Sequence, residues 1–188
     1  MPLPLEIATT SHAHDAQVGE IIDLLCKPSI CGPISDILGR DAFMEAATDL
    51  TQRLYLGKCA AALARYIDES SNTIKPVGII VYNQSPKDPS LAFLELVVTR
   101  EKYRRRKVGT RLLQLVETET ALHGATQLQT LAPQKMPGLQ SLLAKNGFYF
   151  SCMKEDGGLF LRYRKRLKVP RILQKNKKPR IIKLQSLK

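Results

Sequence analysis

Hydrophobic positions recur along the chain with two different periods, which predict strands alternating with helices. Runs of apolar and β-branched residues at 76–83 and 91–99 are typical of buried strands, and the connection between them favours an antiparallel hairpin. From residue 108 to residue 122 the apolar positions recur at helical spacing instead. The full pattern predicts the order β-α-α-β-β-β-α-β-α-β-β, at residues 3–9, 11–25, 41–50, 59–67, 76–83, 91–99, 108–122, 126–131, 139–146, 148–153 and 159–163.

Local signals mark several ends of these elements. Asp41 is a candidate N-cap for the second helix, and Gly124 lies where a glycine commonly ends a helix. His123 is expected to help close that same helix end. Two prolines and a glycine at residues 27–33 predict that the chain turns there, and Glu-Asp-Gly-Gly at 155–158 predicts a tight turn before the last strand.

The basic charge is concentrated at one end of the chain. The 188 residues carry 29 Lys and Arg against 17 Asp and Glu, a formal net charge of +12. Residues 162–188 hold 12 of the basic residues and no acidic one, so the remaining 17 basic residues balance the 17 acidic ones. The sequence therefore predicts a domain at 1–167, formally neutral up to residue 161, followed by a basic extension at 168–188.

The basic end has several possible partners. Its mixture of cations and aliphatic residues suits contact with a nucleic-acid backbone, as on RNA or the ribosome, through residues 162–188. A nuclear address, contact with an anionic membrane surface, or a disordered solubilising tail are alternatives that composition alone leaves open.

Other classes of protein are disfavoured by what the sequence omits. No apolar run reaches the roughly 20 residues of a membrane-spanning helix, and the first residues lack the pattern of a secretory signal. His12 and His14 do not have the spacing of metal ligands on a helix, so no metal site is expected. The cysteines form no Cys-x-x-Cys pair, which favours reduced thiols in the cytoplasm, the nucleus or an organellar matrix; they are Cys26, Cys31, Cys59 and Cys152.

The segment that points to chemistry is a strand, a basic turn and a helix at residues 94–113, LELVVTREKYRRRKVGTRLL. The N-terminus of a helix presents unpaired N–H groups and the positive end of its dipole, an arrangement that binds phosphate oxygens. Four consecutive cations stand at 104–107 and Gly109 follows them. The turn matches neither the P-loop nor the dinucleotide-binding glycine pattern. The alternative is that residues 104–107 form a solvated charged loop. Their place between an apolar strand and an amphipathic helix argues against this alternative.

This segment resembles the pyrophosphate-binding motif of the GNAT N-acetyltransferase superfamily, Arg/Gln-x-x-Gly-x-Gly/Ala. Arg104 matches the first position and Gly109 the last, whereas Lys107 replaces the first glycine. The Gly147-Phe148 step in AKNGFYF is similar to the family's helix-to-strand step. The order of elements over residues 3–167 also matches the family.

The resemblance implies an α/β fold with a mixed, mostly antiparallel sheet and helices on both faces. It also implies acetyl-CoA as cosubstrate and no metal. The pantetheine arm would pair with the backbone of Leu96, Val97 and Val98. The pyrophosphate would be held by the residues of the turn and the helix start: Arg104, Arg105, Arg106, Lys107, Val108, Gly109 and Thr110.

The family's usual catalytic acid is missing here. The tyrosine that many members place five residues before the phenylalanine is Leu143, and an asparagine often found at the start of the same helix is Met136. Two candidates remain for proton transfer. Glu95 is ionisable in an apolar strand, although strand alternation can place it on a solvated face instead. Tyr149 lies near the missing tyrosine, although it can equally be an ordinary strand aromatic.

We therefore expect acetyl transfer to a primary amine by direct attack, without a covalent enzyme intermediate. The acceptor, which the family places between the first helices and the last hairpin, is not identified by the sequence; a protein or an RNA-associated acceptor is possible. The alternative is a GNAT-fold subunit of reduced activity that binds RNA or the ribosome through the basic end.

Overall fold

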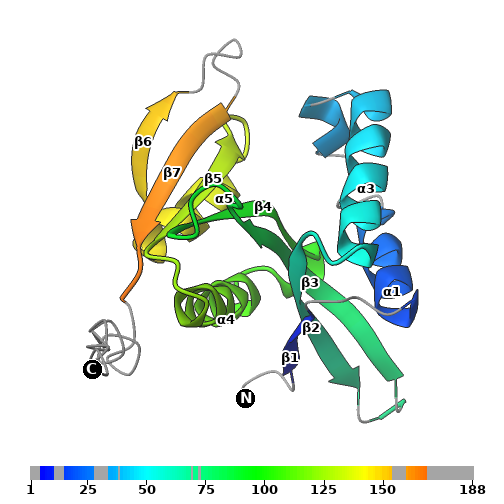
Figure 1. Ribbon diagram of the computed structural model, residues 1–188. Coiled ribbons are helices and arrows are strands. Elements are labelled where there is room, and N and C mark those ends of the chain that lie inside the picture. The colour runs from blue at the N-terminus through cyan, green and yellow to red at the C-terminus, as the bar shows by residue number, and fades with distance from the viewer. Residues whose placement is uncertain are drawn as a thin grey trace, which may run out of the picture.

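The computed structural model describes residues 5–10, 15–27, 34–37, 39–68, 70–71, 73–153 and 160–168 (Figure 1). Its elements follow the predicted order. They are β1 (Leu5–Thr10), α1 (Asp15–Leu25), α3 (Arg40–Tyr55), β2 (Ala60–Asp68), β3 (Thr73–Gln84), β4 (Leu91–Thr99), the 3₁₀ turn η1 (Glu101–Tyr103), α4 (Val108–Leu122), β5 (Gln127–Pro133), α5 (Pro137–Lys145), β6 (Tyr149–Met153) and β7 (Phe160–Arg166).

The strands form one seven-stranded sheet in the order β1-β2-β3-β4-β5-β7-β6. Neighbouring strands are antiparallel except β4 and β5, which are parallel. The parallel pair requires a crossover connection, which α4 supplies. The mixed, mostly antiparallel sheet expected from the sequence is confirmed.

Two hydrophobic cores lie on opposite faces of the sheet. On the first face α4 contributes Leu112 and Leu113, which pack with Ile80 and with residues of β5 and β7. On the second face α1 and α3 pack with Ile79 of the same strand and its neighbours. Adjacent residues of β3 therefore enter different cores, as strand alternation requires. Each fully buried Leu or Ile contributes roughly 1.5–3 kcal/mol to folding.

The second face is covered over only half of the sheet. The described residues of its core belong to α1, α3, β2, β3 and β4 or lie beside them, and none belongs to β5, β6 or β7. Figure 1 shows α1 and α3 on one side of the molecule and β6 and β7 on the other, with α4 on the opposite face. The β5–β7–β6 part of the sheet consequently leaves one face without a described helix.

Gly78 allows α4 to lie close to β3. A Cβ at this position would stand 3.0 Å from Val108 Cγ1, 3.1 Å from Leu112 Cδ1 and 3.2 Å from the backbone oxygen of Val98. The absence of a side chain at Gly78 thus sets the distance between the helix and the sheet.

Several ends differ from the sequence-based expectation. β3 begins at Thr73 rather than Pro76 because Pro76 pairs with Arg65 at a register shift, where a missing N–H is tolerated. The N-cap of α3 is Gly39, so the prediction of Asp41 as N-cap is wrong; Asp41 lies in the first turn. His123 caps α4 and its Nδ1 lies 2.8 Å from the backbone oxygen of Glu119, which confirms its expected role.

Some expectations fall outside the described residues. They concern residues 28–33 of the expected turn at 27–33, the tight turn at 155–158 and the basic extension beyond residue 168. Within the described part of the chain, no helix is long and apolar enough to cross a membrane.

Candidate active site

The parallel strands β4 and β5 pair over only part of their length. Their register runs from Leu91 opposite Gln127 to Leu94 opposite Thr130 and stops there, although β4 continues to Thr99. The Thr130 hydroxyl donates to the backbone oxygen of Leu94 over 3.0 Å, at the last paired position. From Glu95 onwards the β5-facing backbone edge of β4 has no strand partner among the described residues. Its N–H and C=O groups are open to a ligand that lies along it.

A β-bulge at Glu95 begins where this pairing stops. Leu94 pairs with Tyr82 and Leu96 pairs with Val81, so Glu95 is an extra residue. Because one inserted residue reverses the alternation, Leu94 packs in the first core whereas Val98 packs in the second. The side chain of Glu95 is only 18% exposed, although the residue counted with its backbone is exposed. Much of the exposed surface of Glu95 therefore belongs to its backbone.

The Glu95 carboxylate is held by two other elements. Arg53 of α3 donates from Nη1 to Oε1 over 2.8 Å and from Nη2 to Oε2 over 2.6 Å, a two-pronged ion pair. Asn83 of β3 donates from Nδ2 to Oε1 over 2.6 Å. Arg53 Nε also donates to Asp49 over 2.8 Å. The hydrogen bond to Glu95 is the main reason why the pKa of Arg53 is raised above its already high ordinary value, so Arg53 stays protonated.

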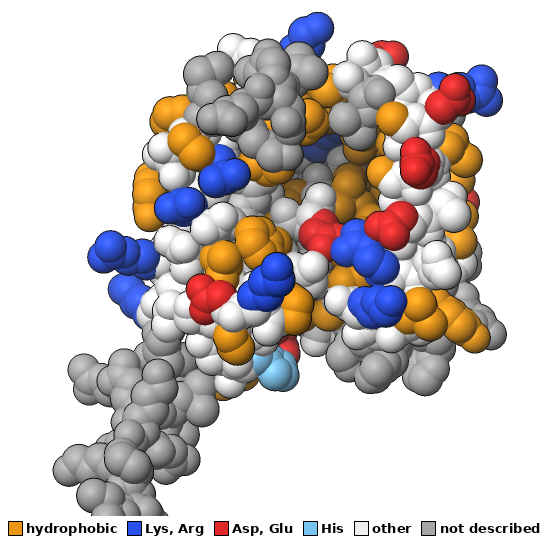
Figure 2. All heavy atoms as spheres, turned by 45° about the horizontal axis from the view of Figure 1, so that its top comes forward, with side chains coloured by type: hydrophobic (Ala, Val, Ile, Leu, Met, Phe, Trp, Pro, Cys, Tyr) orange, Lys and Arg blue, Asp and Glu red, His pale blue; other side chains and the backbone are white. Residues whose placement is uncertain are grey.

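A pocket of about 340 Å³ opens beside this carboxylate. Figure 2 shows the face with its hollow, and paired acidic and basic side chains beside it. The lining comes from both sides of the split between β4 and β5, together with β3 and β7: Asn83, Phe93, Leu94, Glu95, Gln129, Thr130, Leu131 and Arg162. One carboxylate and one guanidinium thus face the same space.

The predicted basic turn leads directly into α4. No side chain caps the first N–H groups of the helix, and its first turn contains no acid. All four side chains at residues 104–107 are exposed, and Arg104 Nε also donates to the Thr99 backbone oxygen over 3.2 Å. Arg105 and Lys107 have positive φ angles of 60° and 61°. The turn therefore offers free N–H donors, a helix dipole and several cations to an anion.

Gly109 has a packing role in addition to any contact with a ligand. A Cβ there would lie 2.9 Å from Leu142 Cδ2 of α5. Its neighbour Thr110 receives a hydrogen bond from Asn146 Nδ2 at 3.5 Å. The start of α4 is thus fixed against the α5 region.

The other sequence-derived candidates lie apart from the pocket. Leu143 is fully buried in the first core, and Met136 is the N-cap of α5. Tyr149 of β6 is 48% exposed and pairs with Arg164 of β7. Because β6 lies three strand spacings of about 4.8 Å from β4, Tyr149 does not line the pocket. Its catalytic role stays a prediction. The structure does bring Glu95 close to the exposed edge of Leu96, Val97 and Val98.

Sequence reasoning missed the partners of Glu95. Arg53 is 42 residues away and its sequence signal is only a helical pair with Asp49. Asn83 and Arg162 reach the site through strand pairing, which depends on the bulge and on the sheet order. No local pattern marks any of the three.

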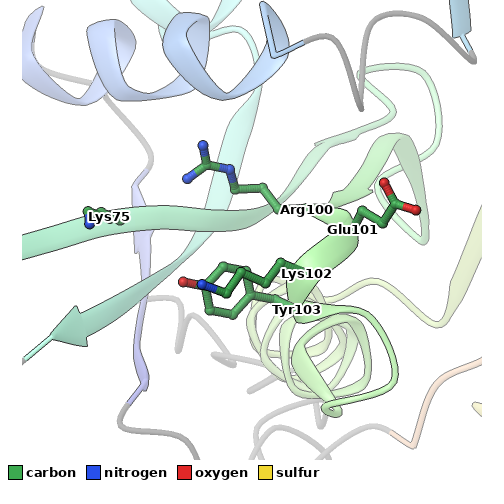
Figure 3. A pocket seen from close by; sticks show the side chains of 5 residues that line it. All are labelled: Lys75, Arg100, Glu101, Lys102 and Tyr103. Atoms are coloured by element: carbon green, nitrogen blue, oxygen red, sulfur yellow. The ribbon is translucent and has the colours of Figure 1, made fainter.

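A larger depression of about 540 Å³ lies elsewhere (Figure 3). It is lined by Lys75, Arg100, Glu101, Lys102 and Tyr103, and in Figure 3 the Glu101 side chain points away from the others. Arg100 Nη1 donates to the Pro76 backbone oxygen over 3.4 Å. This depression contains neither Glu95 nor the exposed edge of β4. Among the described residues, no group of three or more metal-binding side chains comes together.

Comparison with known families assigns the chain. The family model described as "Acetyltransferase (GNAT) family" matches residues 35–148, which include the bulge, the basic turn and α4. The chain belongs to the GNAT acetyltransferase family. A search of curated proteins finds no sequence match.

Solved structures of acetyltransferases share the fold at low sequence identity. The PaiA N-acetyltransferase of Thermoplasma acidophilum, in complex with coenzyme A, is 15% identical with a TM-score of 0.63, over 86% of this chain and 99% of that one. An acetyltransferase of Thermus thermophilus is 20% identical with a TM-score of 0.63, over 88% and 98%. A GNAT-family acetyltransferase of Staphylococcus aureus is 17% identical with a TM-score of 0.62, over 87% and 100%.

Proposed function

We propose that this GNAT protein transfers an acetyl group from acetyl-CoA to a primary amine. The observation that carries the proposal is the split between β4 and β5 at Leu94, with a carboxylate at the split and an uncapped, cation-flanked helix N-terminus beyond the end of β4. The PaiA N-acetyltransferase, which shares the fold, has coenzyme A bound in its crystal structure.

The donor would lie along β4 towards α4. The open edge at Leu96, Val97 and Val98 offers backbone groups to the amides of the pantetheine arm, as a further strand would. The turn at residues 104–107 and the first N–H groups of α4 suit the pyrophosphate, because that end of the helix contains no acid. The residues present therefore fit acetyl-CoA.

The acceptor amine would reach the thioester from the pocket beside Glu95. An ammonium group cannot attack, so one proton must first leave it, and Glu95 is the pocket carboxylate that can take that proton, directly or through a water. The amine nitrogen then bonds to the carbonyl carbon and the carbon–sulfur bond breaks. The second proton of the nitrogen passes to the sulfur, which leaves as the thiol of CoA. This step uses no side-chain acid, which suits the presence of Leu143 at the usual tyrosine position.

Arg53 is a positioning residue in this scheme. It fixes both carboxylate oxygens of Glu95 and is itself fixed by Asp49. A carboxylate has about four lone-pair sites. Glu95 accepts two hydrogen bonds at Oε1 and one at Oε2, so the free lone pair of Oε2 can take up the proton while Arg53 stays in place.

The test separates binding of the donor from catalysis. Titration calorimetry should detect CoA binding by the wild type and by Glu95→Gln with affinities within about threefold, because Glu95 does not face the proposed phosphate site. Release of the CoA thiol with an amine acceptor should fall by roughly 10²–10⁴-fold in Glu95→Gln. Glu6→Gln, the same change on the exposed side of β1, should leave both measurements unchanged.

Two results would contradict the proposal. A folded wild type that gives no heat with CoA excludes the donor site. CoA binding with the same turnover in Glu95→Gln and in the wild type excludes the base. CoA-independent sedimentation of the protein with ribosomes, released by high salt, would favour the alternative of an RNA-bound subunit. Leu143 in place of the family's tyrosine and Met136 in place of its asparagine support that alternative.

A further inference from the structure

Three arginines of β7 lie in a row on the uncovered half of the second face. Tyr163 is buried in the first core, and Lys165 donates to Glu117 of α4 over 2.6 Å, so these two side chains face α4. By alternation, Arg162, Arg164 and Arg166 point to the opposite face. Arg162 does line the pocket on that face.

The cross-strand partners of this row are uncharged. Arg162 pairs with Leu131, Arg164 with Gln129 and Arg166 with Gln127, three residues of β5. On the other side of the row β6 contributes Tyr149 opposite Arg164. None of the three guanidinium groups has an ion pair or hydrogen bond with another described side chain, and Arg164 Nε is buried without an acceptor. Glu95, which shares the pocket with Arg162, is already paired with Arg53. Within the part of the chain that the structure describes, the row is therefore positive charge without an ion-paired carboxylate of its own.

The spacing of the row fits an extended chain. Alternate residues of a strand are about 6.6–6.8 Å apart, for the arginines and equally for side chains on one side of an extended peptide. A planar guanidinium binds a carboxylate through two parallel hydrogen bonds. Acidic residues at every second position of an extended peptide therefore match the row.

The row of arginines runs from the pocket away from the proposed CoA site. Arg162 lies at the pocket, near the split at Leu94, whereas Arg166 pairs with Gln127, which in turn pairs with Leu91 at the start of β4. The basic turn follows the other end of β4. An acceptor on the row would leave the pocket away from the proposed CoA site.

We propose that the acceptor is an acidic polypeptide, whose amine lies at Glu95 and whose alternating carboxylates lie on Arg164 and Arg166. This inference rests on the proposed function. A polypeptide is favoured over a nucleic acid because the acceptor must carry an aliphatic amine and anionic groups on one chain, and lysine or N-terminal amines beside Asp and Glu supply both.

The experiment compares two fluorescent peptides that differ only in charge. Each has one lysine at its centre; one carries glutamates at alternate positions on both sides, and its twin carries glutamines. Anisotropy titrations in the presence of CoA should show the acidic peptide bound at least tenfold more tightly at low salt, with the difference shrinking at high salt. Arg164→Gln/Arg166→Gln should abolish the difference, while Lys58→Gln/Lys87→Gln, which removes the same charge from exposed turns, should keep it.

The outcomes distinguish this inference from the proposed function. Equal binding of the twin peptides by a wild type that binds CoA overturns the acidic acceptor and leaves the acetyltransferase intact. An RNA oligonucleotide that binds the row more tightly than the acidic peptide, and loses affinity in the arginine double variant, assigns the face to nucleic acid and also overturns it. CoA titration of the double variant should match the wild type, which shows that it folds.

Discussion

Two residues of the basic turn have backbone angles that favour glycine. Arg105 and Lys107 have φ near +60°, and a left-handed conformation costs a residue with a side chain about 1–2 kcal/mol. Lys107 stands at the position of the first glycine in the family's motif. Strain of this kind is typical of functional sites. Here the two strained residues place their cationic side chains at the helix end that we propose holds the pyrophosphate.

Replacing Lys107 by glycine separates strain from charge. Lys107→Gly should raise the free energy of unfolding by roughly 0.5–1 kcal/mol, because relief of the left-handed strain exceeds the entropy that glycine loses on folding. Lys107→Ala removes the same charge but keeps the strain, so its stability should stay near that of the wild type. Urea unfolding of the three proteins measures the difference. A glycine variant no more stable than the alanine variant would show that the turn is not strained.

Cys59 should make the stability depend on alkaline pH. Burial, followed by the nearby charge of Glu95, raises the pKa of this thiol to about 11. Between pH 9 and pH 11 the unfolded chain loses the thiol proton while the folded protein keeps it, so stability falls as pH rises, by up to about 3 kcal/mol. Cys59→Ala cannot titrate there, and its unfolding free energy should fall less steeply than that of the wild type. Parallel curves for the two proteins over this range would refute the assignment.

At the scale of elements, the sequence predicts those features of the fold that depend on residues close together along the chain. The order of strands and helices and the basic turn before α4 follow from local periodicity and charge, and the structure agrees. The bulge at Glu95 has no such signal, because β4 reads as one continuous apolar strand. It reverses the faces of Leu94 and Val98, and this reversal was invisible in the sequence. Arg53 reaches Glu95 only through the packing of α3 on the sheet.

The position of α4 should depend on Gly78. Gly78→Val should destabilise the protein by about 1–3 kcal/mol, since the new side chain meets Val108, Leu112 and the backbone oxygen of Val98. The helix N-terminus would shift with α4, so CoA affinity should fall as well. Gly138→Ala, whose new methyl group meets nothing within 4 Å, is the control for both measurements. Normal CoA affinity in a destabilised Gly78→Val protein would show that the helix start does not move.

For the whole molecule, charge and packing divide the chain near residue 167. Leu167 packs against the first core and its N–H donates to the Thr126 backbone oxygen over 2.8 Å. Residues 168–188 contain eight cations and no acid, whereas residues 1–161 are formally neutral. The division at 167/168, and an RNA partner for the extension, stay predictions.

Deleting residues 168–188 should therefore leave the domain folded. RNA affinity should be lost, and each phosphate contact removed should flatten the logarithmic salt dependence by about 0.9 for duplex or 0.7 for single strands. CoA affinity should stay unchanged, because residues 104–107 remain. The measurements are RNA and CoA titrations of both chains across a salt series.

Two results would contradict this prediction. An unfolded truncated protein would place the boundary further along the chain. Unchanged RNA affinity with the same salt slope would move the binding surface to the domain, either to the basic turn or to the three arginines of β7.

The short pairing between β4 and β5 also bears on how such a protein can change over generations. The part of the sheet formed by β1 to β4 and the part formed by β5, β7 and β6 are joined by one four-residue ladder. The arginines of β7 belong to neither hydrophobic core. Substitutions on that face cost little folding energy and leave the proposed coenzyme site on β4 and α4 intact. Acceptor preference can therefore drift in descendants of this sequence while donor chemistry is inherited unaltered.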